Sequence, residues 1–212
     1  MSLSKQQKFW NRIAERYAAR PLKDVAAYDA MIGDVSSHLK PADHVLELGC
    51  GTGGTAIRLA PCVSHWTATD FSAEMIRIAR SKPAGDNLTF KVADAENAYD
   101  GGPFDVICAF NVLHLVENQP AALAQIFANL KPGGLLISKT WCFADLSFKF
   151  RLPFRALQSV GLFPAVKPHS ISDLRQSMTD AGFEITDERL FGKHPQNPYI
   201  VARKPEPQDL AS

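Results

Sequence analysis

The sequence predicts an open α/β sheet with helices packed on both faces. From residue 44 onward, short apolar runs alternate with stretches of helical periodicity. Strands that alternate with helices require right-handed crossovers and become parallel neighbours in one sheet. Two helical runs precede this alternation, and two strand-like runs follow it. At 212 residues the chain fits one domain with a substantial core.

Two helices are expected to form a cover over residues 1–40. The apolar positions of the first helix are Phe9, Trp10, Ile13 and Tyr17. Those of the second helix are Val25, Tyr28, Ile32, Val35 and Leu39. The recurrence every three or four residues is typical of an amphipathic helix, and Pro21 and Pro41 mark where the two runs stop.

Five strands and three helices are expected next. The strands are His44–Leu48, His65–Thr69, Leu88–Val92, Phe104–Phe110 and Gly134–Lys139. The helices are Gly54–Ala60, Ala73–Ser81 and Ala121–Leu130. The strands are short and bounded by turn residues, whereas the helices carry the 3.6-residue period.

The alternation stops after the fifth expected strand. Residues 141–170 are rich in aromatic and cationic side chains and are interpreted as an insertion. A helix at Ser172–Ala181 follows, and then FEITDERL and PYIVARK flank a turn-like segment, which predicts an antiparallel hairpin. We expect one domain over residues 1–203 and a disordered polar tail over residues 204–212.

The composition favours a cytoplasmic protein. The formal net charge is +1, so no global field attracts nucleic acid or an anionic membrane. The four cysteines form no C-x-x-C pair, which argues against a disulfide framework and favours a reducing compartment. The first ten residues lack the apolar stretch of a secretory signal, and no apolar run reaches 18 residues.

The strongest chemical signal is VLELGCGTGGTAIRLA at residues 45–60. An apolar strand leads into a glycine-rich bend, and a helical pattern begins immediately afterwards. Glycine lets the backbone approach a ligand closely, and the helix start offers free N–H groups. The bend could instead be only a tight connection, or it could be a dinucleotide site, because Gly49, Gly51 and Gly54 satisfy G-x-G-x-x-G.

Carboxylates follow the second and third expected strands. Asp70 stands where a ribose would present its two hydroxyls, although it could simply cap the next helix, a task for which Ser72 is better placed. Asp94 follows the third strand, where a carboxylate can accept from an adenine amino group. Asn111 and His114 follow the fourth strand, at the edge where doubly wound sheets bind ligands.

Taken together, the ordered motifs resemble those of class I S-adenosylmethionine-dependent methyltransferases. The motifs are ELGCGTG at 47–53, Asp70, Asp94 with Ala95, FDVI at 104–107 and LKPGG at 130–134. The likeness spans about residues 9–141, and the subgroup it most resembles includes the ubiquinone- and menaquinone-biosynthesis enzymes. It implies a Rossmann-like, doubly wound seven-stranded sheet in the order 3-2-1-4-5-7-6 with one antiparallel strand.

The resemblance also implies S-adenosylmethionine as cofactor and a set of binding residues. These are Tyr17, Glu47, Gly49, Cys50, Gly51, Thr52, Gly53, Asp70, Phe71, Ser72, Met75, Asp94, Ala95 and Asn111. Gly49–Gly51 would lie against the methionine part, and Asn111 would offer its backbone carbonyl to the ammonium. Tyr17 would cover the cofactor carboxylate, or it would simply pack beside Ile13.

Methyl transfer mainly requires alignment and exclusion of water, and a base only when the acceptor arrives protonated. His114 is the candidate base, with His169 and Asp145 as weaker ones, although each could equally be a packing or capping residue. The insertion is the expected acceptor lid, with Trp141, Phe150, Arg151, Phe154 and Arg155 as its candidate contacts. These favour an acidic, aromatic or lipid-like small acceptor, with at most peripheral membrane contact; the charges could also be a solvated face.

Two other functions remain open at this stage. A nicotinamide-dependent oxidoreductase would share the glycine bend and Asp70, but it has no reason to carry the later motifs and the final hairpin. A regulatory protein without turnover could keep every cofactor motif. A nucleic-acid acceptor is disfavoured, because the chain lacks a basic excess and NVLH at 111–114 departs from the DNA-enzyme pattern.

Overall fold

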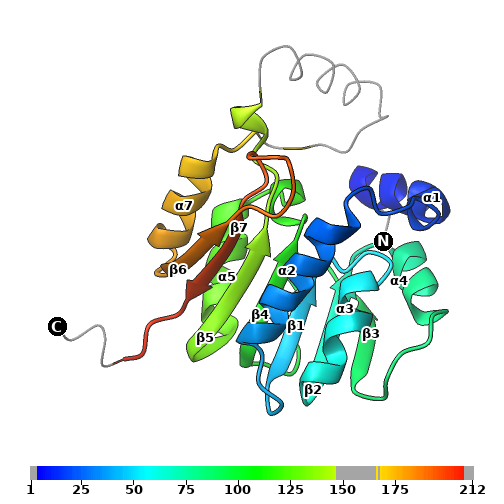
Figure 1. Cartoon of the computed structure of the whole chain (residues 1–212), viewed down its shortest axis with the longest axis horizontal. Helices are drawn as coiled ribbons and strands as arrows, with labels where there is room; N and C mark the ends of the chain where they lie inside the picture. The colour runs from blue at the N-terminus through cyan, green and yellow to red at the C-terminus, as the bar shows by residue number, and fades with distance from the viewer. Residues whose placement is uncertain (1–3, 147–165, 167, 208–212) are drawn as a thin grey trace.

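The computed structural model describes residues 4–146, 166 and 168–207, and its centre is a seven-stranded sheet in the order β3-β2-β1-β4-β5-β7-β6 (Figure 1). The strands are β1 (His44–Leu48), β2 (His65–Asp70), β3 (Leu88–Val92), β4 (Phe104–Phe110), β5 (Leu130–Lys139), β6 (Glu184–Arg189) and β7 (Tyr199–Arg203). The helices are α1 (Lys5–Ala18), α2 (Val25–His38), α3 (Gly54–Leu59), α4 (Ala73–Arg80), α5 (Gln119–Asn129) and α7 (Ile171–Asp180).

The strand directions confirm the topology that the resemblance implied. β1 pairs in parallel with β2 and β4, β2 with β3, and β4 with β5. β7 runs antiparallel to both β5 and β6 and is inserted between them. The expected hairpin therefore forms, and only its second strand opposes the direction of the parallel strands.

The predicted boundaries of helix α5 and of strand β5 were wrong. Leu130 was expected to end a helix, but its backbone is extended (φ −86°, ψ 144°) and it pairs with Phe104 in the sheet. The register with β4 then shifts, so that Val106 pairs with Leu135 and the intervening KPGG residues are accommodated. Helix α5 instead begins earlier, at Gln119, because Asn118 caps it by accepting a hydrogen bond from the Ala121 backbone.

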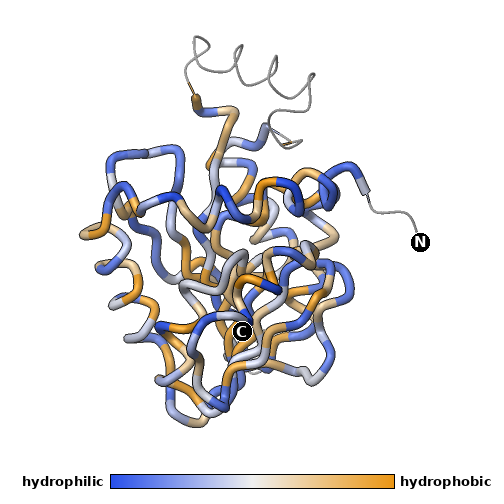
Figure 2. Tube along the Cα trace, turned by 90° about the vertical axis from the view of Figure 1, so that its right-hand side faces the viewer, coloured by the Kyte–Doolittle hydropathy of each residue, from blue (hydrophilic) through white to orange (hydrophobic). Residues whose placement is uncertain are grey.

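Two apolar clusters hold the helices on opposite faces of the sheet. Helices α2, α3 and α4 pack on one face, in a cluster that includes Val35, Trp66 and Tyr199. Helices α5 and α7 pack on the other face, with Leu123 and Leu174 fully buried. In Figure 2 the hydrophobic colour follows the interior strands, whereas hydrophilic residues follow the outer turns. In the part of the chain that is described, every helix is too short or too polar to cross a membrane.

Lys204, the first residue of the predicted tail, contacts strand β5. It exchanges backbone hydrogen bonds with the glycine pair in that strand, donating to the Gly134 carbonyl and accepting from the Gly133 N–H. Its Nζ donates to the carbonyls of Phe127 and Leu130 at 2.8 and 2.7 Å. Contacts with the sheet therefore continue past β7, residues 208–212 lie outside the described residues, and a disordered tail stays a prediction.

Candidate functional site

The glycine bend after β1 adopts backbone conformations that favour glycine. Gly49, Gly51 and Gly53 have φ angles of +66°, +54° and +78°. A Cβ on Gly49 would lie 2.6 Å from Cγ2 of Val112, and one on Gly53 would lie 2.7 Å from Cζ of Phe90. A Cβ on Gly51 would meet only Cε1 of Tyr17, at 3.8 Å. Two of the glycines are thus required by packing, while the space beside Gly51 is open.

This open space belongs to a cavity of about 830 Å³ at the carboxyl ends of β1, β2, β3 and β4. Twelve of the residues expected at a cofactor site line it. They are Tyr17, Glu47, Gly49, Cys50, Gly51, Thr52, Asp70, Phe71, Met75, Asp94, Ala95 and Asn111. The volume lies within the range of small-molecule sites. The structure therefore brings the glycine bend and the two predicted acids, Asp70 and Asp94, to one cavity.

Gly53 and Ser72, which were also expected there, are not among the residues that line it. Gly53 packs against Phe90 and precedes α3 as its N-cap residue. The Ser72 hydroxyl caps α4 by accepting from the Met75 N–H at 3.2 Å, and it donates to Oδ1 of Asn11 at 2.6 Å. The capping function foreseen for Ser72 is confirmed, and it occupies the side chain.

Asp70 is held rigidly at the end of β2. Its Oδ2 accepts from the Gly51 N–H at 2.9 Å, and its Oδ1 accepts from the Ser72 N–H at 2.8 Å. Burial raises the pKa of Asp70, and these two backbone donors oppose that effect. A carboxylate has about four lone-pair sites, so each oxygen keeps acceptor capacity for a ligand.

Glu47 is the most deeply buried acid that lines the cavity. Burial raises its pKa to about 8, opposed by a hydrogen bond that Trp66 Nε1 donates to its Oε2 at 3.1 Å. The negative charge of Asp70 raises it further. At pH 7 the carboxyl is therefore mainly protonated, and a cationic group entering the cavity would favour its ionised form.

Asn111 follows β4 with a positive φ of 56°, and among the described residues it is the one non-glycine residue in that region. Its N–H donates to the Lys139 carbonyl at 2.7 Å, and its Oδ1 accepts from Asn197 at 3.5 Å. Asparagine tolerates the left-handed region better than most residues. A sparsely populated conformation held by neighbours is common at functional sites.

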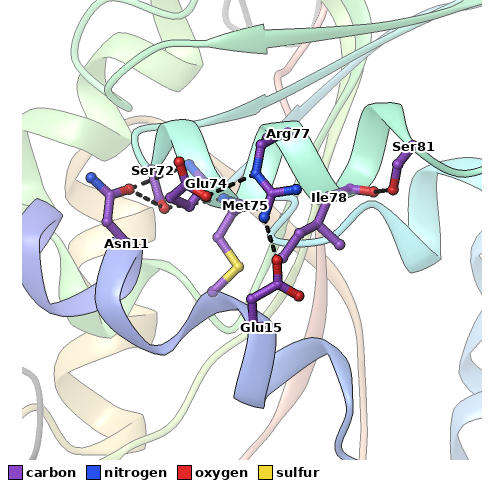
Figure 3. Close-up of polar contacts among 8 residues, drawn as sticks. All are labelled: Asn11, Glu15, Ser72, Glu74, Met75, Arg77, Ile78 and Ser81. Atoms are coloured by element: carbon purple, nitrogen blue, oxygen red, sulfur yellow. Dashed lines mark hydrogen bonds and ion pairs between the residues drawn. The ribbon is translucent and has the colours of Figure 1, made fainter.

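Helix α1 covers the cavity because it is fastened to α4 (Figure 3). Oδ1 of Asn11 faces the start of α4, accepting from the Ser72 hydroxyl and, at 3.4 Å, from the Glu74 N–H. Arg77 of α4 pairs with Glu15 of α1 as well as with Glu74. Ala14, Met75 and Ile78 bury the apolar part of the contact. This docking places Trp10 and Tyr17 at the cavity, and Tyr17 contacts Trp10 edge-on.

Other residues that line the cavity were not expected there. Tyr28 of α2 lines it beside Thr55, with a hydrogen bond of 3.1 Å between the two hydroxyls. Arg20 and Lys23 come from the connection between α1 and α2. The helical periodicity placed Tyr28 among the apolar residues of its helix. Its hydroxyl, which usually finds a hydrogen-bond partner when buried, was the signal that could have indicated a polar site.

The acceptor side is only partly described. His114 is buried against Phe143, with ring centroids 5.6 Å apart, and it is not among the residues that line the cavity. Burial lowers its pKa to about 4. Trp141 lies against Phe143 and His194. The remaining candidate lid contacts, Phe150, Arg151, Phe154 and Arg155, lie outside the described residues.

Of the two weaker candidates for a base, Asp145 is the last residue of η3 (Phe143–Asp145) and His169 lies shortly before α7. Asp145 accepts from the Ile171 N–H at 2.7 Å, so it already supports the start of α7. The His169 carbonyl accepts from the Ala144 N–H at 3.1 Å. The hydrogen bond from Ile171 thus supports the capping role of Asp145, while a catalytic role for Asp145 or His169 stays a prediction.

A family model described as a methyltransferase domain matches residues 6–188. The chain belongs to this methyltransferase family. The resemblance to S-adenosylmethionine-dependent enzymes is thereby confirmed. The fold of this methyltransferase domain is similar to an S-adenosylmethionine-dependent methyltransferase from Mesorhizobium loti (TM-score 0.69, 16% identity, covering 84% of this chain and 98% of that one). It is also similar to magnesium protoporphyrin IX methyltransferase from Synechocystis with bound S-adenosylhomocysteine (TM-score 0.66, 21% identity, covering 95% and 94%).

The curated relatives are diverse. The domain is 31% identical over 116 residues to demethylmenaquinone methyltransferase of Leptospira interrogans, covering 51% of this chain and 47% of that protein. It is 36% identical over 121 residues to highly reducing polyketide synthase 40 of Fusarium mangiferae, covering 52% of this chain and 5% of the synthase. The chain thus spans less than half the length of these relatives. Because they act in different systems, they do not single out the quinone-biosynthesis subgroup.

Proposed function

We propose that this domain binds S-adenosylmethionine in the cavity and transfers its methyl group to a small-molecule acceptor, in the cytoplasm. The observation that carries the proposal is the convergence of the glycine bend, Asp70 and Asp94 on one cavity in a chain that belongs to the methyltransferase family. A nicotinamide-dependent oxidoreductase gains no support from the family match. A regulatory protein without turnover differs from this proposal only in lacking transfer.

The residues at the cavity fit the cofactor's functional groups. Asp70 has acceptor capacity left on both oxygens, which suits the paired hydroxyls of a ribose. Gly51 leaves space where any side chain would intrude. Asp94, exposed after β3, suits an amino group at the adenine edge. The backbone hydrogen bonds from Gly51 and Ser72 already fix the Asp70 carboxylate in the position that this assignment needs.

Glu47 suits the cofactor's ammonium group. A cation beside this carboxyl lowers its pKa, so binding should release a proton near pH 7. The protonated state without ligand avoids a buried uncompensated charge, which would be costly. We propose that the backbone carbonyl of Asn111 shares this ammonium, as its place at the cavity allows.

The protein's contribution to transfer is positioning. A sulfonium supplies an already electrophilic methyl group, so the chain needs to align the acceptor and exclude water. Orientation of this kind can supply roughly 7–11 kcal/mol. Helix α1, held on α4, closes one side with Trp10 and Tyr17. We propose that Trp141 and the insertion after β5 contact an acidic, aromatic or lipid-like acceptor, and that His114 acts as base when the acceptor carries a proton.

Calorimetry with S-adenosylhomocysteine and with NAD tests the cofactor. We expect binding of the first and no comparable binding of NAD, and the reverse result would overturn the proposal. Asp70→Asn should weaken S-adenosylhomocysteine binding roughly 10–100-fold, because a hydrogen bond to a charged group contributes about 1.5–3 kcal/mol. Asp86→Ala, at an exposed carboxylate remote from the cavity lining, is the matched control and should bind normally.

Two further measurements separate the remaining possibilities. Thermal denaturation of Asp70→Asn shows whether the variant is folded, so that weak binding is not mistaken for unfolding. A screen of small metabolites for release of S-adenosylhomocysteine then tests transfer itself. Binding of the cofactor with no turnover on any acceptor class would favour the regulatory protein over the enzyme.

A further inference from the structure

A cluster of possible metal ligands lies where α2 meets the sheet edge formed by β6 and β7. Asp34 and His38 are one helical turn apart on α2, and Nε2 of His38 lies 3.5 Å from Oδ2 of Asp34. Asp187 of β6 faces them, and one ligand atom from each of the three residues lies within 4.8 Å of the other two. The i, i+4 spacing puts both helical side chains on one face, which is a common way for a helix to supply two ligands.

The fold uses these ligand atoms only in part. Oδ2 of Asp34, Nε2 of His38 and Oδ2 of Asp187 are inaccessible to solvent and make no hydrogen bond of ordinary geometry. Buried polar atoms without partners are rare, and each one calls for an explanation such as an ion or a water. Here three polar atoms face one another, and Oδ2 of Asp187 has Arg189 Nε beside it. Oδ2 of Asp34 and Nε2 of His38 make no such hydrogen bond, and a cation or a hydrogen-bond donor would suit them.

Arg189 supplies only part of that charge. Its guanidinium pairs with Oδ1 of Asp34, and its Nε lies 2.7 Å from Oδ2 of Asp187. Oδ2 of Asp34 and Nε2 of His38 make no hydrogen bond with this guanidinium. Two carboxylates and one guanidinium leave a net negative charge when His38 is neutral. A bound cation would therefore be attracted to the pocket between α2 and β6.

Tyr199 of β7 is a second, independent indication. Its side chain is fully buried, and its hydroxyl has no hydrogen bond of ordinary geometry. This hydroxyl lies near the carboxylate of Asp34. The Tyr199 hydroxyl is therefore a further buried polar group at the cluster without a hydrogen bond of ordinary geometry.

We propose that Asp34, His38 and Asp187 bind one divalent metal ion of the zinc class. One imidazole nitrogen and two carboxylate oxygens are a donor set that zinc accepts, with a fourth position for water. Metal–ligand bonds of about 2.0–2.1 Å in a tetrahedron put ligand atoms about 3.3 Å apart. The separation of 3.5 Å between Asp34 and His38 matches this value. Asp187, whose ligand atom lies within 4.8 Å of the others, would move closer and exchange its contact with Arg189 for the metal.

The metal would fasten α2 to the sheet edge rather than take part in chemistry at the cavity. Tyr28 lines the cavity from the same helix, six residues before Asp34. At 1.5 Å per residue, this separation is about 9 Å along the helix axis. The ion would therefore hold the helix that carries Tyr28, at a place apart from the glycine bend.

Calorimetric titration of the chelator-treated full chain with ZnCl₂ tests the proposal. We expect one ion per chain, with affinity at least tenfold weaker in His38→Gln and in Asp187→Asn. His44→Gln removes an exposed histidine outside the cluster and should bind zinc as the wild type does. Arg189→Gln removes the competing cation and should bind zinc more tightly than the wild type.

Each other outcome would contradict the proposal. No stoichiometric binding by the wild type would leave the cluster as an ion-pair network around Arg189. Binding that survives in His38→Gln and Asp187→Asn would place the ion elsewhere, for example at a cysteine. Titration with Co²⁺ detects that case, because thiolate ligands produce a strong charge-transfer band that nitrogen and oxygen ligands do not. Circular dichroism of each variant confirms that it is folded.

Discussion

Replacing Glu47 with glutamine tests the energetic consequence of the buried carboxyl at the cavity. Burial raises the folded-state pKa of Glu47 to about 8 from an ordinary value of 4.5. A group with a raised folded-state pKa contributes stability that is fully present below the unfolded value. That stability is lost progressively as the pH rises from about 4.5 to about 8, because in this range the carboxyl ionises only in the unfolded chain.

The size of this effect follows from the two pKa values. At about 1.4 kcal/mol for each unit of pKa, the wild type should lose about 4 kcal/mol between pH 5 and pH 9 through this group alone. Glutamine keeps an oxygen that can accept from Trp66 Nε1 but cannot ionise. The free-energy cost of burying the glutamine amide is the same at every pH. The stability of the variant should therefore lack the pH dependence that the ionisation of Glu47 gives to the wild type.

The assay is guanidinium denaturation of both proteins without ligand at pH 5, 7 and 9. Between pH 5 and pH 9, the free energy of unfolding of Glu47→Gln should rise by about 4 kcal/mol relative to that of the wild type. Glu184→Gln, at an exposed carboxylate paired with Arg203, serves as the control and should follow the wild type. Parallel stability curves for the wild type and Glu47→Gln would refute the argument from burial.

Two substitutions test the glycine bend and the predicted base. Gly49→Ala should lower the free energy of unfolding by about 2–4 kcal/mol, because a Cβ would lie 2.6 Å from Val112 at a φ of +66°. In contrast, a Cβ added by Gly33→Ala within α2 would meet nothing within 4 Å, so this substitution should be neutral or stabilising by up to about 1 kcal/mol. Urea denaturation measures the free energy of unfolding of both variants. Equal effects of the two substitutions would contradict the packing argument. If His114 is the general base, His114→Ala should lower kcat about 10²–10⁴-fold on an acceptor that carries a proton. Wild-type turnover would leave His114 only its packing against Phe143.

Local patterns were sufficient where one sequence feature determines one structural feature. The glycines at 49–54 predicted a bend, and the bend is there, with positive φ angles at Gly49, Gly51 and Gly53. Strand alternation predicted the parallel sheet, because right-handed crossovers leave few other arrangements. Asp70 and Asp94 were correctly placed at one edge, since the carboxyl ends of parallel strands meet there.

Tertiary contacts decided what no local pattern could. Ser72 and Asn111 carry similar polar side chains near strand ends, yet Ser72 is taken up by capping α4 and by Asn11, while Asn111 faces the cavity. Tyr28 looked like one more core residue until α2 packed beside α3 and brought its hydroxyl to Thr55. The sequence by itself determined the alternation of strands and helices, the glycine bend and the acids that follow β2 and β3, and the family resemblance implied the strand order. Only packing decided which side chains reach the cavity, why the pKa of Glu47 is raised, and how Asp34 and Asp187 come together. The reason is that burial and proximity depend on segments far apart in the chain.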